Sequence, residues 1–264
     1  MIKAIIFDLD GVLIELKDTH YECLNMALGT IDTKYLISLD EHYKVYDGLP
    51  TRDKLKILTN QKGLAEKYYD EIKKLKQQFT IEFILNNVER DESMVSMMKS
   101  LKKDSYIIAI ASNSVKNTIY SAAVMQGYVG YIDMVMSNQD VNYSKPNPEI
   151  YLTTISKLGL KPEECIIVED SPFGIEAAQN SGGYVIKVKN STEVTYNKLK
   201  EQINLIEMKE TNKKWDGSKW KILIPMAGAG SRFMQAGYTF PKPLIEVNGK
   251  PMIQVVVENL NIYA

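Results

Sequence analysis

Carboxylates, a lysine and a hydroxyl stand after short apolar segments at four places in this 264-residue chain. The first segment, 3–7, is typical of a strand buried on both faces of a parallel sheet. In an open parallel sheet, the ligand crevice lies outside the carboxyl ends of the strands. One such residue is weak support for a site, because strands often end at an Asp that only makes a turn. Several polar residues at one edge of the sheet favour a ligand site there. They are Asp8, Asp10, Ser112, Asn113, Lys145, Glu169 and Asp170.

These residue types in one crevice indicate phosphoryl transfer. Carboxylates that share a crevice repel one another, and a divalent cation relieves this repulsion. Ligands that are all oxygen favour a hard ion, and Mg²⁺ typically takes one or two carboxylates, waters and a substrate phosphate. With Lys145 and the Ser112 hydroxyl, such an ion can hold a phosphoryl group. One carboxylate can then attack phosphorus, while a second protonates the leaving oxygen and later activates water.

The elements that must position these residues alternate between helix and strand from about residue 91. Alternation with short connections predicts a doubly wound, Rossmann-like parallel α/β sheet with helices on both faces. Gly11 allows a sharp turn after the first strand. We expect strands over 3–7, 106–110, 134–136, 166–168 and 184–188, and helices over 93–101, 118–125, 148–158, 174–180 and 192–203.

Residues 15–86 form a different block, because they show helical periodicity and few strand signals. We interpret this block as an all-helical cap carried over the mouth of the sheet, and assign the core to residues 1–14 and 87–207. Lys and Glu on the polar faces of the cap helices are expected to be solvated. The predicted cap helices cover 19–28, 34–46, 51–58 and 64–83.

The composition argues against several other classes of protein. Hydrophobic content of 45% and charged content of 25% are typical of a soluble globular protein. A net charge of −1 provides no basic field for nucleic acid or an acidic membrane surface. Cys23 and Cys165 lie far apart without metal-type spacing, so we expect reduced, partly buried thiols. The first apolar run breaks at Asp8, unlike a signal peptide or a membrane span, and the expected location is cytoplasmic.

Four motifs in order resemble the haloacid dehalogenase superfamily. They are Asp8-Leu9-Asp10-Gly11-Val12, Ser112-Asn113, Ser144-Lys145-Pro146, and Glu169-Asp170-Ser171-Pro172. The match spans residues 1 to about 190 and is nearest to the branch with a helical (C1) cap after the first motif. That branch includes β-phosphoglucomutase and many sugar-phosphate phosphatases.

The resemblance implies roles in phosphoryl transfer. Asp8 would be the nucleophile and Asp10 the general acid–base. Ser112 would hold a phosphoryl oxygen, with Asn113 nearby. Lys145 would bridge the phosphoryl group and Asp8.

The resemblance also implies a Mg²⁺ site. Asp8 would be a metal ligand through its carboxylate and Asp10 through its backbone carbonyl. Asp170 would bind the metal as well. Glu169 would support the metal directly or through water.

Three further residues belong to the cap. His20 and Arg52 occupy positions where this branch often places residues that face the substrate, although a helix-face histidine and a surface arginine are equally simple interpretations. His42 lies in a charged helix and is expected to be solvated. Many relatives have an acidic residue followed by Ser or Thr after the first motif, whereas this chain has Glu15-Leu16. The hinge and the substrate contacts of the cap therefore stay open.

The last 45 residues show a second resemblance, after a polar linker at 208–219. An apolar run over 220–225 leads into a glycine loop, which can bring backbone N–H groups to phosphates. With residues 241–253, it resembles the opening of a sugar-nucleotide pyrophosphorylase, a nucleotidyltransferase that joins an NTP and a sugar-1-phosphate. One strand and one helix cannot bury a core, so we expect 220–264 to be an incomplete α/β nucleotidyltransferase fragment. The residues implied in nucleotide binding, vestigial or incomplete, are Gly228, Gly230, Arg232 and Lys242.

These observations predict a Mg²⁺-dependent phosphatase that hydrolyses a small sugar or polyol phosphate through an aspartyl-phosphate. The context would be nucleotide-sugar or capsule-type glycan synthesis. A phosphomutase with the same covalent chemistry is one alternative, and a non-catalytic module of a bifunctional nucleotidyltransferase is another. Intact Asp8, Asp10, Lys145 and Asp170 argue against the latter. We expect no nucleic-acid or membrane partner, while self-association and contact with a nucleotidyltransferase domain stay open.

Overall fold

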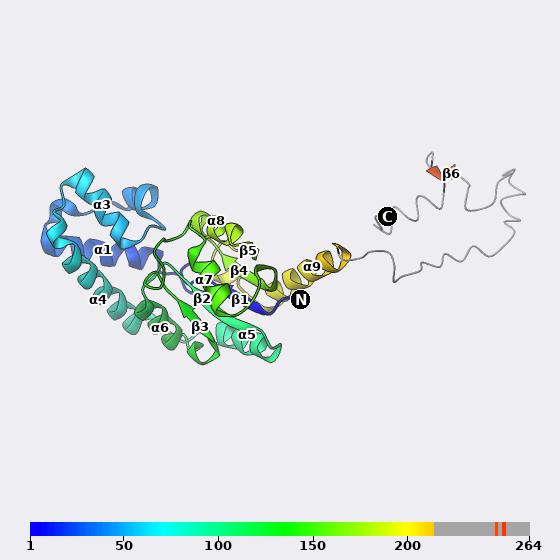
Figure 1. The fold of residues 1–264 in the computed structure, drawn as a ribbon. Helices are drawn as coiled ribbons and strands as arrows, with labels where there is room; N and C mark the ends of the chain where they lie inside the picture. Colours follow the sequence, from blue (N-terminus) through cyan, green and yellow to red (C-terminus); the bar gives the residue numbers. More distant parts are fainter. Residues whose placement is uncertain (214–245, 248–249, 252–264) are drawn as a thin grey trace, which may run out of the picture. The chain divides into compact units, whose positions relative to one another are not determined.

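The computed structural model describes residues 1–213, 246–247 and 250–251 and divides into two units, Met1–Lys209 and Glu210–Ala264. The first unit holds the sheet that positions the predicted catalytic residues (Figure 1). In the second unit, β6 (Glu246–Val247) pairs antiparallel with β7 (Lys250–Pro251). Among the described residues, no helix is both long and apolar enough to cross a membrane.

A five-stranded parallel sheet in the order β3-β2-β1-β4-β5 forms the core, which confirms the predicted Rossmann-like architecture. The central strand β1 (Ala4–Phe7) lies between β2 (Ile107–Ala111) and β4 (Cys165–Glu169). The edges are β3 (Met134–Met136) and β5 (Tyr184–Lys187). Phe7 pairs with Ile110 on one side and Val168 on the other, so the residues after these strands emerge at one level.

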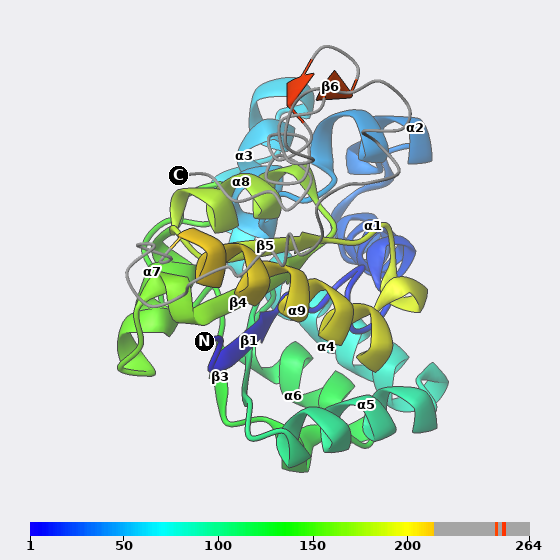
Figure 2. The same ribbon diagram turned by 90° about the vertical axis from the view of Figure 1, so that its right-hand side faces the viewer.

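Both faces of the sheet are covered, because successive strand residues point to opposite sides. Ile5 and Phe7 face an apolar cluster built with α5 (Glu92–Lys103), α6 (Lys116–Met125) and α9 (Tyr196–Lys213). Ala4 and Ile6 face a second cluster built with α7 (Glu149–Lys157) and α8 (Pro172–Asn180), and Figure 2 gives a second view of these helices. Burial on both sides fixes the direction of β1 and therefore the point at which Asp8 leaves the sheet.

A helical cap lies between β1 and β2 in the chain. It contains α1 (Lys17–Ile31), α2 (Leu39–Glu41), α3 (Thr51–Lys62) and α4 (Tyr69–Asn87). These helices share their own apolar cluster, which includes Leu28, Leu55 and Ile72. Figure 1 shows α1, α3 and α4 gathered at one end of the unit.

The single helix predicted over 34–46 is wrong. Asp32 and Ser38 each accept a backbone N–H at the start of a separate short turn, which divides the segment. The segment ends in a π-helical turn, His42–Tyr46. Local capping therefore outweighs the apolar periodicity here.

The last described helix extends further than the terminal helix predicted over 192–203. Helix α9 runs to Lys213 and thus enters the stretch predicted as a linker. The predicted nucleotide-binding residues lie outside the described residues, so their roles stay predictions. These residues are Gly228, Gly230, Arg232 and Lys242.

Candidate active site

A cavity of about 660 Å³ lies between the carboxyl edge of the sheet and the cap. Every site residue predicted for the core and the cap lines it except Glu169, which is completely buried. The parallel strand ends therefore bring together side chains that are far apart in sequence, as expected for an open α/β sheet. The lining residues predicted from the sequence are Asp8, Asp10, His20, Arg52, Ser112, Asn113, Lys145 and Asp170.

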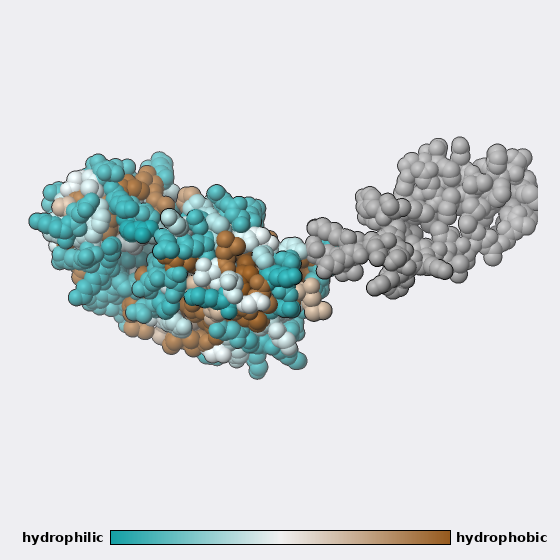
Figure 3. Space-filling view, in the orientation of Figure 1, coloured by the Kyte–Doolittle hydropathy of each residue, from teal (hydrophilic) through white to brown (hydrophobic). Residues whose placement is uncertain are grey.

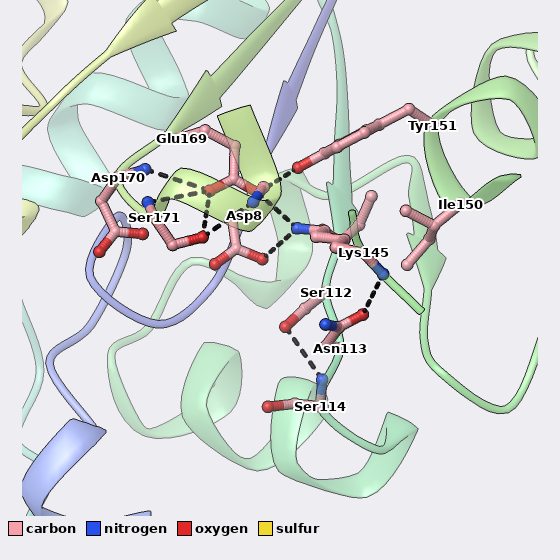
Figure 4. A network of polar contacts seen from close by, with 12 residues as sticks. Asp8, Ser112, Asn113, Ser114, Lys145, Ile150, Tyr151, Glu169, Asp170 and Ser171 are labelled. Carbon is pink, nitrogen blue, oxygen red and sulfur yellow. Dashed lines mark hydrogen bonds and ion pairs between the residues drawn. The ribbon is translucent and has the colours of Figure 1, made fainter. Parts of the chain in front are cut away.

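Lys145 connects the ends of three strands. Its ammonium donates to Asp8 Oδ1 at 2.7 Å, to Glu169 Oε1 at 2.6 Å and to the Ala111 carbonyl at 2.9 Å (Figure 4). Burial would lower the pKa of Lys145, but the Asp8 and Glu169 carboxylates outweigh it and raise this pKa. Burial raises the pKa of Asp8, with Lys145 opposing the shift and Glu169 adding to it. The Asp8 carboxylate is thus held through Oδ1 alone, and Oδ2 accepts no hydrogen bond from the described residues.

Glu169 acts inside the protein rather than at the cavity surface. Oε1 accepts from Lys145 and from the Tyr151 hydroxyl, and Oε2 accepts from the Asp170 backbone N–H at 3.1 Å. The Lys145 ammonium also lies 4.7 Å from the centroid of the Tyr151 ring. Tyr151 was not predicted as a site residue, because helical periodicity marks it only as an apolar position of α7.

The carboxylates of Asp8, Glu169 and Asp170 form an acidic cluster whose nearest oxygens all lie within 4.8 Å of one another. Asp170 Oδ1 is buried and has no hydrogen-bond partner among the described residues, and burial raises the pKa of this carboxyl. Gly11, at φ +83°, lies so close that an added Cβ would stand 2.2 Å from Asp170 Oδ2. An orphaned oxygen in a tightly packed, all-oxygen donor set fits a hard divalent cation such as Mg²⁺.

Lys17, at the start of α1, also contacts this cluster and was not predicted. Its ammonium lies 2.9 Å from Asp170 Oδ2, while 37% of the Lys17 side chain is exposed. The sequence carried a weak signal for it, since Lys17 follows the Glu15-Leu16 departure from the family pattern. A cation that binds Asp170 through both oxygens would have to displace this ammonium.

Asp10 contacts the segment that leads from β1 into the first cap helix, α1. Its Oδ1 accepts the Leu16 N–H at 2.6 Å, and its Oδ2 lies 3.9 Å from His20 Nε2. Burial raises the pKa of Asp10 to about 7, although the Leu16 hydrogen bond and Lys17 oppose it. A carboxyl group with a pKa near neutrality suits both the donation and the removal of a proton.

The structure gives His20 and Arg52 different settings. His20 Nδ1 lies 3.1 Å from the Lys76 ammonium, which only donates, so the ring proton belongs on Nε2 facing Asp10. Burial, followed by the Lys76 charge, holds the pKa of His20 well below its usual value. Arg52 has more than half of its side chain exposed and lies 3.5 Å from its neighbour Asp53.

Ser112 and Asn113 follow β2 and line the cavity. Ser112 is 3% exposed, and its hydroxyl oxygen accepts the Ser114 N–H at 3.2 Å. Asn113 Oδ1 accepts the Lys145 N–H at 3.3 Å, which ties the strand end to the lysine loop. The Ser112 hydroxyl keeps its own proton free to donate to a bound phosphoryl oxygen.

Two expectations about the polar faces of the cap are wrong. His42 is 1% exposed rather than solvated, and neither of its ring nitrogens has a hydrogen bond within the part of the chain that the structure describes. Lys54 of α3 is 7% exposed and lines the cavity, and Lys76 of α4 lines it as well. Lys54 stands four residues before Leu58, and Lys76 stands four residues after Ile72, so each lysine lies beside the apolar stripe of its helix rather than opposite it.

The comparisons with known proteins agree with this geometry. The family model described as haloacid dehalogenase-like hydrolase matches residues 5–188. The phosphorylated carbohydrates phosphatase of Thermotoga maritima is 26% identical over 68% of this chain and 82% of its own. Pyrophosphatase PpaX of Bacillus cereus is 29% identical over 69% of this chain and 80% of its own.

Solved structures show the same fold. A β-phosphoglucomutase from Clostridium difficile is 23% identical, with a TM-score of 0.63 over 79% of this chain and all of its own. CbbY from Rhodobacter sphaeroides, solved in complex with phosphate, is 20% identical, with a TM-score of 0.66 over 71% of this chain and 86% of its own. The family match and the phosphatase relatives confirm the predicted enzyme class, a phosphoric monoester hydrolase. This chain belongs to the haloacid dehalogenase-like hydrolases.

Proposed function

We propose that this chain is a Mg²⁺-dependent phosphatase that hydrolyses a small sugar or polyol phosphate through an aspartyl-phosphate at Asp8. One observation carries the proposal: Lys145 fixes Asp8 by Oδ1 at 2.7 Å, so that Oδ2 is free beside Asp170 at the cavity. The phosphorylated carbohydrates phosphatase among the relatives supports the substrate class.

The residues support a two-step reaction. In the first step, Asp8 Oδ2 attacks phosphorus, the ester P–O bond breaks, and protonated Asp10 gives its proton to the leaving oxygen. In the second step, Asp10 takes a proton from water, whose oxygen attacks phosphorus and releases inorganic phosphate from Asp8. The pKa of Asp10, raised to about 7 by burial, suits both proton transfers.

The other polar groups bind and orient the phosphoryl group. The Lys145 ammonium and the Ser112 hydroxyl would donate to its oxygens as charge spreads over them. Asp8, Asp170 and the Asp10 backbone carbonyl would hold Mg²⁺, with Glu169 behind them. When bound, this ion supplies positive charge that offsets the carboxylates and the phosphoryl group.

A phosphomutase remains the second candidate, because β-phosphoglucomutase is among the similar folds. It would use the same attack by Asp8 and return the phosphoryl group to a sugar rather than to water. We also propose a role in nucleotide-sugar or capsule-type glycan synthesis, which rests on the sequence of 220–264. That segment would belong to a nucleotidyltransferase that also acts on a sugar phosphate.

A panel of phosphate esters tests the proposal. The chain is incubated with Mg²⁺ and with sugar, polyol and other phosphate monoesters, and released phosphate is measured. We expect release from sugar or polyol phosphates, and loss of release in Asp8→Asn. No release, together with isomerisation of a sugar phosphate when a bisphosphate primer is added, would favour the mutase. Unchanged release in Asp8→Asn would overturn the mechanism.

A further inference from the structure

The ammonium of Lys145 has no hydrogen-bond donor left for a substrate. An ammonium carries three N–H donors, and here they go to Asp8 Oδ1 at 2.7 Å, Glu169 Oε1 at 2.6 Å and the Ala111 carbonyl at 2.9 Å. The proposed phosphatase mechanism requires Lys145 to donate to a phosphoryl oxygen. When a phosphoryl group binds, the ammonium must therefore turn away from one of these three acceptors.

Solvent has little access to the acceptors of Lys145. The face of the cap seen in Figure 3 is largely hydrophilic, and a surface lysine such as Lys56 of α3, with 62% of its side chain exposed, can exchange its partner Asp53 for water. Only 4% of the Lys145 side chain is exposed, and the Glu169 side chain is fully enclosed. A buried acceptor that loses its donor keeps the full cost of its desolvation. Lys145 can therefore leave most readily an acceptor that has a second donor inside the protein.

Glu169 Oε1 has such a second donor, the hydroxyl of Tyr151. Asp8 Oδ1 accepts no other hydrogen bond from the described residues, and no other described side chain donates to the completely buried Ala111 carbonyl. If Lys145 left either of these acceptors, no other side chain would replace it. If Lys145 leaves Glu169, Tyr151 still donates to Oε1. The bond between Lys145 and Glu169 is therefore the one that a phosphoryl group can replace at least cost.

The Glu169 carboxylate is fixed independently of Lys145. Its Oε2 accepts the Asp170 N–H at 3.1 Å. Gly174 of α8 packs directly against the carboxylate, because an added Cβ at this glycine would stand 2.0 Å from Glu169 Oε1. The carboxylate thus has no room on this side to follow the ammonium. The movement that admits a phosphoryl group falls to Lys145.

Tyr151 and Lys145 are held together by one loop and the helix that follows it. Tyr151 lies in the first turn of α7, and Lys145 lies in the loop before this helix. The Glu149 carboxylate closes the loop by accepting the N–H groups of Asn142 at 3.0 Å and Tyr143 at 2.8 Å. The centroid of the Tyr151 ring lies 4.7 Å from the Lys145 ammonium. This attraction is electrostatic, so it persists while the N–H groups turn.

We propose that Tyr151 is a positioning residue for phosphoryl transfer, whose hydroxyl holds Glu169 while the Lys145 ammonium exchanges Glu169 for the phosphoryl group. Asp8 Oδ1 stays bound to the ammonium, which leaves Oδ2 free for attack (Figure 4). Tyr151 does not line the cavity and acts through Glu169 and Lys145. The role rests on the proposed phosphatase activity and explains how one lysine can serve both the folded state and the reaction.

Tyr151→Phe tests this role, because phenylalanine keeps the ring beside the ammonium and removes the hydroxyl. In the variant, Lys145 can bind a phosphoryl group only by leaving Glu169 Oε1 without a donor. The affinity for inorganic phosphate, measured by calorimetry with Mg²⁺ present, should fall about 10- to 100-fold, as expected for a hydrogen bond to a charged group. The kcat/KM for an ester that the chain hydrolyses should fall by the same factor. A purely structural role would lower the thermal midpoint and leave the phosphate affinity of the folded chain unchanged.

Tyr128→Phe is the matched control. Tyr128 is also completely buried, its hydroxyl has no hydrogen-bond partner among the described residues, and it does not line the cavity. This variant should bind inorganic phosphate as wild type does. An unchanged phosphate affinity in Tyr151→Phe, or an equal loss in Tyr128→Phe, would overturn the role of Tyr151. The absence of phosphate binding in wild type would overturn it as well.

A crystal structure of the wild-type chain with Mg²⁺ and inorganic phosphate tests the exchange without any variant. The Lys145 ammonium should contact a phosphate oxygen and Asp8 Oδ1, while Glu169 Oε1 accepts from Tyr151 alone. An ammonium that kept all three of its present acceptors would overturn the exchange. An ammonium that left Asp8 or Ala111 rather than Glu169 would also overturn it.

These measurements keep the role of Tyr151 apart from the catalytic proposal, since binding of inorganic phosphate needs no hydrolysis. If no ester is hydrolysed but Tyr151→Phe weakens phosphate binding and the exchange is seen, only the phosphatase is overturned. If esters are hydrolysed and Tyr151→Phe binds phosphate as wild type does, only the role of Tyr151 is overturned.

Discussion

Removal of the Lys145 ammonium should destabilise the folded chain as well as abolish activity. Lys145→Met keeps most of the volume of the side chain but deletes hydrogen bonds to Asp8, Glu169 and the Ala111 carbonyl. Glu169 is completely buried and 11% of the Asp8 side chain is exposed, so two carboxylates would face each other without a cation. Breaking a buried ion pair by removing one partner costs about 3–5 kcal/mol.

The pH dependence of this loss has a defined sign. Burial already raises the pKa of Asp8, and Lys145 is the group that opposes the rise. Without Lys145 the pKa rises further, so the folded variant takes up a proton more readily than the unfolded chain does. A carboxyl with a raised folded pKa loses stability as pH increases from its unfolded pKa, about 4, to its folded value. The difference between wild type and variant should therefore be largest above pH 7 and smallest near pH 4.

Urea unfolding followed by circular dichroism, without added metal, measures this difference. The matched control is Lys3→Met, whose ammonium pairs with Glu164 at 2.7 Å while 55% of its side chain is exposed. An exposed pair of this kind contributes about 0–1 kcal/mol. If Lys145→Met at pH 8 lost no more stability than Lys3→Met, the central place of Lys145 in the site would be refuted.

Three further predictions follow from the same contacts. Asp10→Asn should stabilise the chain at pH 8 by about 1–3 kcal/mol, measured by urea unfolding. This is less than the full rise of the Asp10 pKa from 3.8 to about 7 implies, because a fifth of the side chain is exposed. The gain in stability should vanish near pH 4, and a loss of stability at pH 8 would contradict the account. Lys17→Met should tighten Mg²⁺ binding by roughly threefold to fivefold in calorimetry, because a part-exposed ion pair with Asp170 no longer competes, whereas weaker binding would assign Lys17 a supporting role. Tyr151→Phe should lose about 1–2 kcal/mol in urea unfolding, because Glu169 Oε1 loses a buried donor, and an unchanged midpoint would count against that bond.

The sheet and the acidic edge could be predicted because their signals are local and repeated. Short apolar runs such as Ile166-Ile167-Val168 are followed by polar residues, and parallel strands end on the same side. The predicted strands of the core sheet match the observed ones to within one residue at every end. The order of the strands then brings Asp8, Ser112 and Asp170 to one cavity.

The cap wall could not be predicted from the same signals. Helical periodicity identifies the apolar stripe that contains Ile72 and Leu75, but a lysine beside such a stripe is assigned to solvent on its residue type alone. Lys54, Lys76 and His42 were therefore assigned to the surface, although tertiary packing encloses Lys54 and His42 and directs Lys76 at the cavity. Substrate specificity depends on which polar side chains of the cap face the cavity, and only the packing of the cap against the core determines this.

The central claim is that Asp8 becomes covalently phosphorylated, and peptide mass spectrometry tests it most directly. The chain is mixed with Mg²⁺ and a phosphate ester that it hydrolyses, quenched in acid during turnover, and digested into peptides. We predict a mass increase of one phosphoryl group on the peptide that contains Asp8, absent from Asp8→Asn and retained in Lys56→Met. Active turnover with an unmodified Asp8 peptide at every quench time, or the phosphoryl group on another residue, would contradict the account.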